Sequence, residues 1–460
     1  MAELNKYKAY PEYKDSGVEW LGKIPKGWKA SRVKHIAPFQ VGWTPSTKND
    51  ANFIGENLWV NISDLREKFI SSTVKCISDQ AVKEASMNIT PKGSLLYSFK
   101  LSVGSVSFSA RDLYTNEAIA SFLDSATLPL SYLYYALPQF VIENASTNIY
   151  GAKILNQDLI KNSFLLAPST HEAEKIASFL DHETAKIDNL IEKQQQLIEL
   201  LKEKRQAVIS HAVTKGLNPD VLMKDSGIEW LGEVPEHWVS VRVKQISSFI
   251  TSGPRGWSDF ITDEGNEIFL QSGDLNNELG LQLDKAKRVS PPKNAEGVRT
   301  KLVAGDLVVC ITGANTGRVA IVPELSQSTY VNQHLSLIRP NTSIINSAFL
   351  GYSLASSVGR SFFDVAQYGL KEGLSLGNVS EAPLALPPKH EQDVIVKYLE
   401  SIRNNYDNLS RLSTIQIELL KERRTALISA AVTGKIDVRD WVAPDSSEMA
   451  SIEESQEVNA

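Results

Sequence analysis

Residues that could carry out chemistry are present in the sequence, but their spacing supports none of the common reactions. There is no Gly-x-x-x-x-Gly-Lys-Ser/Thr loop to cradle phosphates, no Gly-x-Gly-x-x-Gly turn and no His-Glu-x-x-His zinc motif. An Asn-Pro-Pro-aromatic run, which amino-methyltransferases use to hold a flipped base, is absent as well. The seven histidines are scattered, with no neighbouring cysteine or carboxylate cluster that would suggest a metal site. We therefore expect that the chain is not an enzyme and holds no metal or cofactor itself.

Composition and charge are those of a water-soluble protein. The 460 residues are 42% hydrophobic and 22% charged, and no apolar run approaches the roughly 18 residues that a membrane span requires. Residues 1–6 lack the apolar core of a signal peptide. Cys76 and Cys310 are too few and too isolated for a disulfide framework or a zinc site, so we expect a cytoplasmic protein.

The negative charge is concentrated at the C-terminal end. The net charge is −6, and residues 442–460 carry five acidic residues and no basic one. We expect an acidic, disordered tail over 435–460, because such compositions cannot bury enough apolar surface to fold. The remainder of the chain is close to neutral. If DNA is a partner, its contacts must come from local clusters and not from a global field.

Two long stretches predict the helices that organise the chain. Residues 171–215 and 389–433 contain no Gly or Pro, and apolar residues recur in them at steps of three and four, as from Ile176 to Val208. A glycine follows each stretch, as expected at a helix end. At about 1.5 Å per residue, each helix would run roughly 60 Å.

The chain also contains an internal duplication. Residues 14–22 return as 224–232 at an offset of 210. Residues 200–214 return as 419–433 at an offset of 219, with eleven of the fifteen positions identical. The two halves therefore share a start and an end, and their middles have diverged in length.

Each middle is typical of a mixed domain with a substantial β component. Alternating and β-branched stretches predict strands at 95–99 and 103–108 in the first half, and at 307–311 and 318–322 in the second. The fold class is therefore α/β (α+β), with a pseudo-two-fold internal repeat. The predicted boundaries are a first domain over 1–168 (repeat element 14–37), a helix over 169–216, a second domain over 217–388 (repeat element 224–247), a helix over 389–434, and the tail over 435–460.

Several motifs together are specific enough to suggest a family. They are the opening at 10–22 with its return from Lys224, the helix entry at 386–392, the Leu-Leu-Lys-Glu-(Lys/Arg)-Arg core of both helices, and the G-x-T-P-S-like turn at 42–46. Over residues 8–440 this order resembles the specificity subunit of type I restriction-modification enzymes. The first half departs from the pattern, because Ala167-Pro168-Ser169-Thr170 replaces the Pro-Pro helix entry.

The resemblance implies a non-catalytic subunit that binds double-stranded DNA. Each α/β domain would be a target recognition domain that reads one half of a split DNA sequence. The two helices would form a long antiparallel two-helix coiled coil that separates the domains and docks two modification subunits. Those subunits hold S-adenosylmethionine and methylate adenine, and two restriction (motor-nuclease) subunits that need ATP and Mg²⁺ complete the complex.

Two further expectations follow from the resemblance. Because the two middles differ in sequence and length, the two half-sites should differ, so the full target is asymmetric. The helix pair would act as a ruler. Four residues added to each helix lengthen it by about 6 Å, comparable to one or two base-pair steps of about 3.4 Å.

If the resemblance holds, the residues that read bases lie in polar loops, where side chains can form bidentate hydrogen bonds with base edges. In the first domain the candidates are Trp43, Thr44, Ser46, Lys48, Lys100, Ser102, Ser105, Tyr150 and Lys153. In the second they are Arg255, Trp257, Thr312, Asn315, Arg318, Tyr368 and Lys371. Apolar helix residues outside the seam shared by the two helices would remain for partner subunits, namely Ile191, Ile198, Ile415 and Ile417.

Two other functions stay open at this point. The chain could be a stand-alone bipartite DNA-binding regulator without a methylase, or a structural scaffold whose domains bind protein. A neighbouring gene for an Asn-Pro-Pro-aromatic methyltransferase would favour the specificity subunit. Tight, specific DNA binding by the purified chain alone would favour the regulator.

Overall fold

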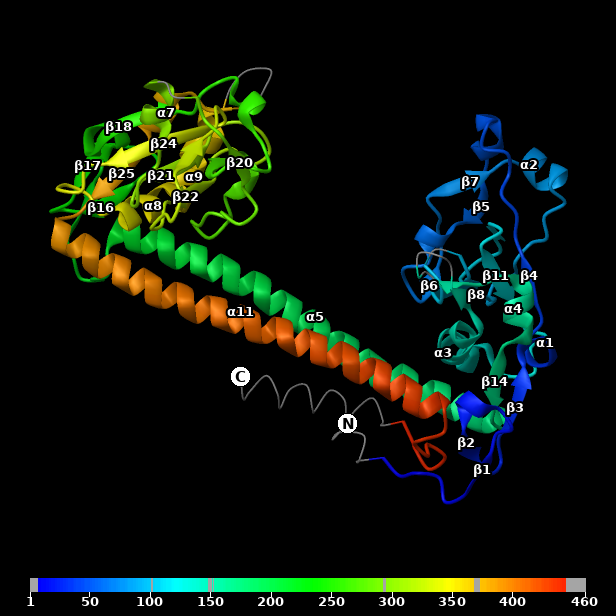
Figure 1. The fold of residues 1–460 in the computed structure, drawn as a ribbon. Helices are drawn as coiled ribbons and strands as arrows, with labels where there is room; N and C mark the ends of the chain where they lie inside the picture. The colour runs from blue at the N-terminus through cyan, green and yellow to red at the C-terminus, as the bar shows by residue number, and fades with distance from the viewer. Residues whose placement is uncertain are drawn as a thin grey trace. The chain divides into compact units, whose positions relative to one another are not determined.

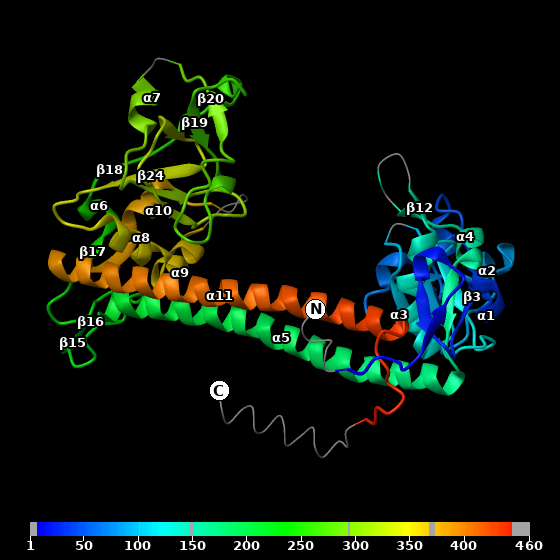
Figure 2. The same ribbon diagram turned by 60° about the horizontal axis from the view of Figure 1, so that its bottom comes forward.

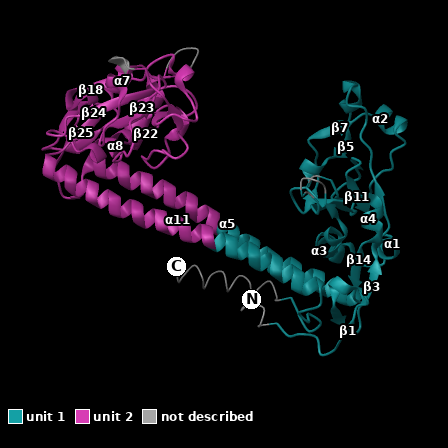
Figure 3. Ribbon diagram, viewed as in Figure 1, with its two compact units in different colours: residues 1–193, 416–460 teal, residues 194–415 magenta. Residues whose placement is uncertain are grey.

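The chain folds into two compact units, each of which draws on both long helices (Figure 3). Unit 1 comprises residues 1–193 and 416–460, and unit 2 comprises residues 194–415. The computed structural model describes residues 7–100, 102–147, 151, 153–292, 295–367 and 373–443. Each unit contains one mixed α/β domain, as predicted.

The two long helices are confirmed. Helix α5 spans Thr170–Lys215 and helix α11 spans Lys389–Val432 (Figure 1). Each ends at a glycine with positive φ, Gly216 at 78° and Gly434 at 72°. A left-handed residue after the last turn satisfies the free carbonyls of a helix end, and glycine adopts that conformation without a steric cost.

In each unit the two helices lie side by side (Figures 1 and 2). In unit 2, Arg205 Nη1 of α5 lies 2.6 Å from Asp407 Oδ1 of α11. In unit 1, Arg424 Nε of α11 lies 2.9 Å from Asp188 Oδ1 of α5. A later residue of α5 thus meets an earlier residue of α11, so the pairing is antiparallel. The offset of 219 relates Arg205 to Arg424 and Asp188 to Asp407, so one ion pair is the repeat copy of the other.

The domain of unit 1 is built on two sheets and a covering helix. The central five-stranded sheet has the order β4-β11-β8-β9-β6, and a three-stranded sheet has the order β10-β5-β7. Helix α3 (Leu130–Val141) buries its aromatic face in the core beside the central sheet. The strands are β4 (Phe39–Val41), β5 (Asn57–Val60), β6 (Phe69–Ile70), β7 (Lys75–Ile77), β8 (Leu95–Ser98), β9 (Val106–Ser109), β10 (Tyr114–Thr115) and β11 (Ile119–Phe122).

The domain of unit 2 repeats this plan. Its sheets have the orders β18-β24-β21-β22 and β20-β19-β23. In both units a parallel pair joins two strands of the smaller sheet, β10 with β5 and β19 with β23. The elements are β18 (Ser247–Ser252), β19 (Glu267–Leu270), β20 (Lys287–Val289), β21 (Leu307–Cys310), β22 (Val319–Ile321), β23 (Thr329–Val331), β24 (Leu335–Pro340), α8 (Ser347–Ala355) and α9 (Ser357–Ala366).

Each domain connects to its long helix through a two-stranded sheet. Strand β14 pairs with β3 just before α5 begins, and β25 pairs with β17 just before α11 begins. Trp28 and Trp238, which precede β3 and β17, are 1% and 0% exposed. Their repetition therefore reflects a shared role in the core. The bounds are β3 (Lys29–Arg32), β14 (Phe164–Ala167), β17 (Val239–Arg242) and β25 (Pro383–Leu386).

Short elements complete both units. They are β1 (Tyr13–Asp15), β2 (Lys23–Pro25), α1 (Val33–Ile36), α2 (Asp79–Glu84), β12 (Ser146–Thr147), β13 (Lys153–Ile154), α4 (Gln157–Asn162), β15 (Met223–Asp225), β16 (Glu233–Pro235), α6 (Val243–Ile246), α7 (Ala295–Thr300) and α10 (Leu376–Glu381).

The predicted tail is wrong at its beginning. Ile436 and Val438 are 3% and 1% exposed and belong to the core of unit 1. The backbone N–H of Asp437 donates to the carbonyl of Lys8 at 2.7 Å, which places this segment beside the N-terminal one. The remainder of the predicted tail, 444–460, lies outside the described residues.

Candidate nucleic-acid interface

In each unit three loops meet where the central sheet adjoins the smaller one. We call them the first loop (42–48 in unit 1, 253–257 in unit 2), the hairpin loop (99–105 and 311–318) and the asparagine turn (116–118 and 332–334). The first loop follows β4 or β18, and the hairpin loop joins β8 to β9 or β21 to β22. The asparagine turn leads from the smaller sheet into the central one.

In unit 1 the asparagine turn and the residue before it, Thr115, hold the other two loops in place. Asn116 Oδ1 accepts the backbone N–H of Ala118 at 3.0 Å, which closes the turn. The carbonyl of Ala118 accepts the N–H of Phe99 from the hairpin loop at 3.0 Å. From the first loop, Trp43 donates its N–H to the carbonyl of Thr115 at 2.9 Å. Backbone bonds of this kind fix loop positions independently of the side chains that the loops display.

Unit 2 repeats the bond that closes the turn and the bond to the hairpin loop, whereas the first loop is held by a different backbone bond. Asn332 Oδ1 accepts the N–H of His334 at 3.0 Å, and the carbonyl of His334 accepts the N–H of Ile311 at 2.9 Å. Gly253 of the first loop donates its N–H to the carbonyl of Asn332 at 3.1 Å. A hydrogen bond between Thr312 Oγ1 and His334 Nδ1 adds a side-chain link between the hairpin loop and the turn.

The close approach of the first loop requires glycine. A Cβ on Gly42 would lie 1.8 Å from the carbonyl oxygen of Thr115, and one on Gly253 would lie 1.9 Å from that of Val331. Both distances are far inside van der Waals contact. The two glycines therefore mark the same packing constraint in the two units.

Most of the described candidates in unit 1 are available for contact. Trp43 is 58% exposed, and Ser46, Lys48, Lys100 and Ser102 are also exposed. The other described candidates differ in their surroundings: Thr44 donates its hydroxyl proton to Glu117, Ser105 is partly buried, and Lys153 is exposed on strand β13. Tyr150 lies outside the described residues.

One candidate of unit 2 is wrong. Trp257 is only 2% exposed, because its ring packs 5.8 Å from that of Phe269 and 5.3 Å from that of Tyr330. Its indole therefore packs into the core at the end of the first loop. Arg255, two residues earlier, is exposed. Tyr368 and Lys371 lie outside the described residues.

Asn315 and Arg318 hold the hairpin loop of unit 2 in place. Asn315 Nδ2 donates to the carbonyl of Ser272 at 3.0 Å, and Arg318 Nη1 donates to that of Leu275 at 2.8 Å. Asp274 lies between Ser272 and Leu275 in the sequence, and burial raises the pKa of its carboxyl. Burial likewise raises the pKa of the Cys310 thiol at the base of the hairpin, which disfavours the reactive thiolate.

Sequence reasoning missed the side chains of the asparagine turn. Glu117 and Gln333 follow equivalent asparagines, and Gln333 Nε2 lies 3.1 Å from Nε2 of the exposed His334. A signal was available, because Tyr114-Thr115-Asn116-Glu117 matches Tyr330-Val331-Asn332-Gln333 with a change from acid to amide. A carboxylate accepts from the amino group of cytosine, whereas an amide pairs with adenine in both directions. The equivalent positions therefore carry different hydrogen-bonding groups, a carboxylate in unit 1 and an amide in unit 2.

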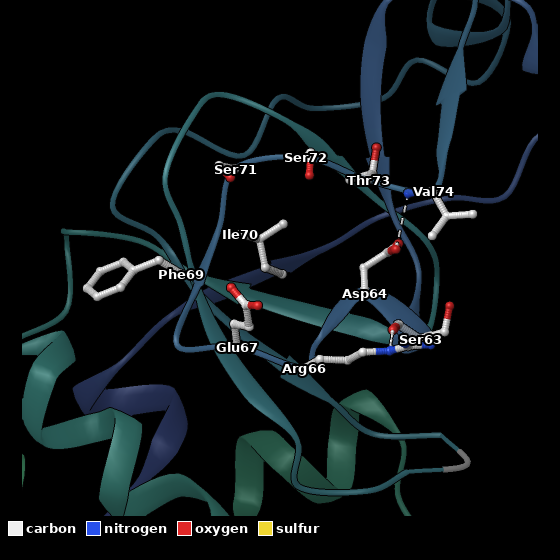
Figure 4. Close-up of a pocket in the computed structure, with 10 residues that line it drawn as sticks. All are labelled: Ser63, Asp64, Arg66, Glu67, Phe69, Ile70, Ser71, Ser72, Thr73 and Val74. Atoms are coloured by element: carbon white, nitrogen blue, oxygen red, sulfur yellow. Dashed lines mark hydrogen bonds between the residues drawn. The ribbon is translucent and has the colours of Figure 1, made fainter. Parts of the chain in front are cut away.

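A shallow hollow in unit 1 lies apart from the three loops along the chain (Figure 4). It has a volume of about 300 Å³ and is lined by residues between 63 and 74. Its polar groups bond to one another: Arg66 Nε donates to the carbonyl of Ser63 at 2.8 Å, and the N–H of Val74 donates to Asp64 Oδ1 at 3.2 Å.

Within the described ranges there is no group of three or more His, Cys, Asp or Glu side chains that could hold a metal ion. Nor is any described helix long and apolar enough to cross a membrane.

The helix residues predicted to meet partners are only partly exposed. Ile191 and Ile198 are half-buried and Ile417 is 8% exposed, so Ile417 belongs to the seam and its assignment is wrong. Ile415 is 39% exposed. The side chains that the helices expose instead are mainly leucines.

These leucines form a second stripe on each helix, here called the leucine stripes. The stripe of α5 contains Leu190, Leu197 and Leu200, and that of α11 contains Leu409, Leu412 and Leu419. They are between 39% and 54% exposed. The 219-residue offset relates Leu190 to Leu409 and Leu200 to Leu419, so the two stripes are largely copies.

A comparison with known families decides what these paired domains are. The model of the "Type I restriction modification DNA specificity domain" matches residues 25–200 and again residues 235–419, most of the chain. The chain belongs to this specificity-domain family.

Relatives within the specificity-domain family agree. The chain is 30% identical over 186 residues to the type I restriction enzyme MjaIX specificity subunit of Methanocaldococcus jannaschii, covering 39% of this chain and 42% of that subunit. It is 24% identical over 323 residues to the EcoBI specificity subunit of Escherichia coli, covering 68% and 66%. The matches thus span less than two thirds of either relative.

Solved structures show the same fold. One comes from a study of complex assembly and conformational transition of the type I R-M system, with a TM-score of 0.68 at 16% identity, covering 90% of this chain and 99% of that one. Another is the HsdS subunit from Thermoanaerobacter tengcongensis, with a TM-score of 0.52 at 16% identity, covering 90% and 98%.

Proposed function

We propose that this chain is the DNA-recognition subunit of a type I restriction-modification complex and reads a bipartite, asymmetric target. Each domain presents one set of three loops to one half-site. The chain itself is non-catalytic. Methylation and cleavage belong to the modification and restriction subunits, which hold S-adenosylmethionine, ATP and Mg²⁺.

The observation that supports this proposal is the contrast between backbone and side chains in the three loops. The bonds that close the turns at Asn116 and Asn332, and those that tie the turns to the hairpin loops, are equivalent in the two units. The side chains that these loops display differ: Glu117 faces Thr44, whereas Gln333 adjoins an exposed His334. Two domains with the same loop backbone but different loop side chains suit two different half-sites, because DNA sequence is read by side chains that contact base edges.

The leucine stripes support docking of two modification subunits. Large apolar side chains left exposed at regular spacing mark interaction surfaces. Because the stripe on α5 recurs on α11, the chain offers two similar surfaces, as two copies of one partner require. Residues 195–203 of α5 also border an open hollow that includes Leu200.

Methylation mapping tests the proposal directly. The chain and its modification subunit are expressed together in a host without other methylases, and adenine methylation is mapped over the genome. We expect one split motif with unlike halves. A further variant, Gln333→Glu, should change a base only in the half read by unit 2, whereas Glu117→Gln should change only the other half. Undivided or absent motifs, with a soluble complex present, contradict the proposal.

A further inference from the structure

The C-terminal and N-terminal segments of unit 1 cover a surface at the beginning of α5. Phe179 lies at its centre and is 1% exposed. The ring of Tyr7 meets it edge-on at 5.4 Å, and the ring of Trp441 meets it edge-on at 5.6 Å. Both covering residues come from outside the helix, one from each end of the chain.

Polar groups anchor these two segments. Lys175 Nζ donates to the carbonyl of Arg439 at 2.5 Å, and the Tyr7 hydroxyl donates to Glu183 Oε2 at 3.0 Å. The His182 ring lies 5.7 Å from that of Trp441. The covered surface of unit 1 is thus apolar at its centre and charged around its rim.

The repeat copy of this surface in unit 2 is open. Tyr398 corresponds to Phe179 and is 40% exposed, and Val394, one turn earlier on the same face, is 56% exposed. Beside Tyr398 lies a pocket of about 250 Å³, lined by Val208, His211, Ala212, Leu217 and Tyr398.

The open surface also lacks three of the polar residues that hold or border the cover in unit 1. Where unit 1 has Lys175, His182 and Glu183, unit 2 has Val394, Ser401 and Ile402. An apolar surface that lies open where its repeat copy is covered is a candidate interaction site for another molecule.

The connectivity explains which cover is missing. In unit 1 two chain segments, 7–12 and 435–443, share the surface. In unit 2 a single linker, 216–222, runs from α5 to β15 and replaces both. Leu217 stands at the offset of 210 from Tyr7 and lines the pocket. At the offset of 219 the position of Trp441 is occupied by Leu222, which is 73% exposed, so the linker supplies no aromatic cover.

We infer that this surface of unit 2 binds a segment of the modification subunit that inserts an aromatic side chain, tryptophan for preference, at the position Trp441 has in unit 1. The pocket is large enough, since a cavity of roughly 150 Å³ accommodates benzene and an indole is somewhat larger. The inference rests on the proposed function, because it takes the partner to be the modification subunit. It adds a contact separate from the leucine stripes.

The test compares two valine-to-lysine variants of the full chain in binding to purified modification subunit. Val394→Lys introduces the residue that unit 1 carries at the equivalent position, Lys175, so the fold should tolerate it. Val239→Lys is the matched control, because Val239 is 58% exposed and its own repeat copy is Lys29. We expect Val394→Lys to weaken binding at least tenfold and Val239→Lys to change it less than twofold, with both melting temperatures unchanged.

A photo-crosslinker at position 398 identifies the occupant in the assembled complex. The expected adduct lies on a modification-subunit segment that contains Trp, Tyr or Phe. Unchanged binding of Val394→Lys, or adducts that stay within the chain or join two copies of it, would overturn the inference. The proposed function stands in that case if the complex still forms and methylates a split motif, and fails independently if it does not.

Discussion

The proposed function predicts that the chain docks two modification subunits and that replacing the leucine stripe of one helix removes one of them. The perturbation changes Leu190, Leu197 and Leu200 of α5 together to Gln. Glutamine is a good helix former, and Gln416 of α11 is the natural repeat copy of Leu197. The helix and its seam with α11 should therefore remain intact.

The size of the effect follows from the exposure of these side chains. Each leucine still exposes about two fifths of its surface, between 39% and 45%. Burying a whole leucine side chain contributes about 1.5–3 kcal/mol, so covering the exposed part contributes about 1 kcal/mol for each residue. Three leucines contribute about 3 kcal/mol, which corresponds to roughly 100-fold in the dissociation constant.

Native mass spectrometry and calorimetric titration measure the outcome. We expect the wild-type chain to bind two modification subunits and the variant to bind one tightly and one about 100-fold more weakly. The matching triple change of Leu409, Leu412 and Leu419 should give the same loss. The control is Leu222→Gln, since Leu222 is 73% exposed but lies on neither helix. Retention of two subunits with unchanged affinity in both triple variants would refute this role for the stripes.

Three other predictions concern stability and target spacing. Asp306→Asn should lower the free energy of unfolding by about 3 kcal/mol, which chemical denaturation measures. The reason is that the partly buried Arg339 loses the carboxylate to which it now donates two hydrogen bonds of 2.8 Å. Hydrogen bonds from Arg439 hold the pKa of the Asp437 carboxyl below its usual range. These bonds therefore contribute fully to stability above the unfolded pKa of about 3.9, and this stability is lost as the pH falls through the lower folded pKa. Trp441 fluorescence should therefore report detachment of the C-terminal segment at a higher pH in Asp437→Asn than in the wild type. Inserting four residues into both α5 and α11 should change the unread spacer of the methylated motif and leave both half-sites intact; altered half-sites with the old spacer would contradict it.

The two long helices were predicted well because the signals for a helix and for its end both lie in the local sequence. A Gly- and Pro-free run with apolar steps of three and four specifies a helix, and Gly216 and Gly434 specify its end. The same steps did not reveal which stripe the partner helix would cover. That choice depends on the antiparallel register, so the isoleucines were favoured where the structure exposes leucines such as Leu200 and Leu419.

The wrong predictions for Trp257 and for the start of the tail have the same cause: both segments pack against residues that are distant in the sequence. Trp257 stands in a polar, Gly-rich stretch, and nothing nearby in the sequence shows that Phe269 and Tyr330 bury it. The composition of 435–460 is dominated by its acidic end, which obscured the packing of Ile436 and Val438. The asparagine turn was visible only as a repeat, since its importance depends on bonds to both neighbouring loops.

The copied ion pairs have a consequence for shorter versions of this protein. Helix α5 alone carries both an aspartate and an arginine of the two pairs, Asp188 and Arg205. Two identical molecules that each end after α5 could therefore match Asp188 of one with Arg205 of the other, twice over, in the same antiparallel register. Such a half-length chain would form a self-complementary homodimer. Its two identical recognition domains would bind a palindromic DNA target.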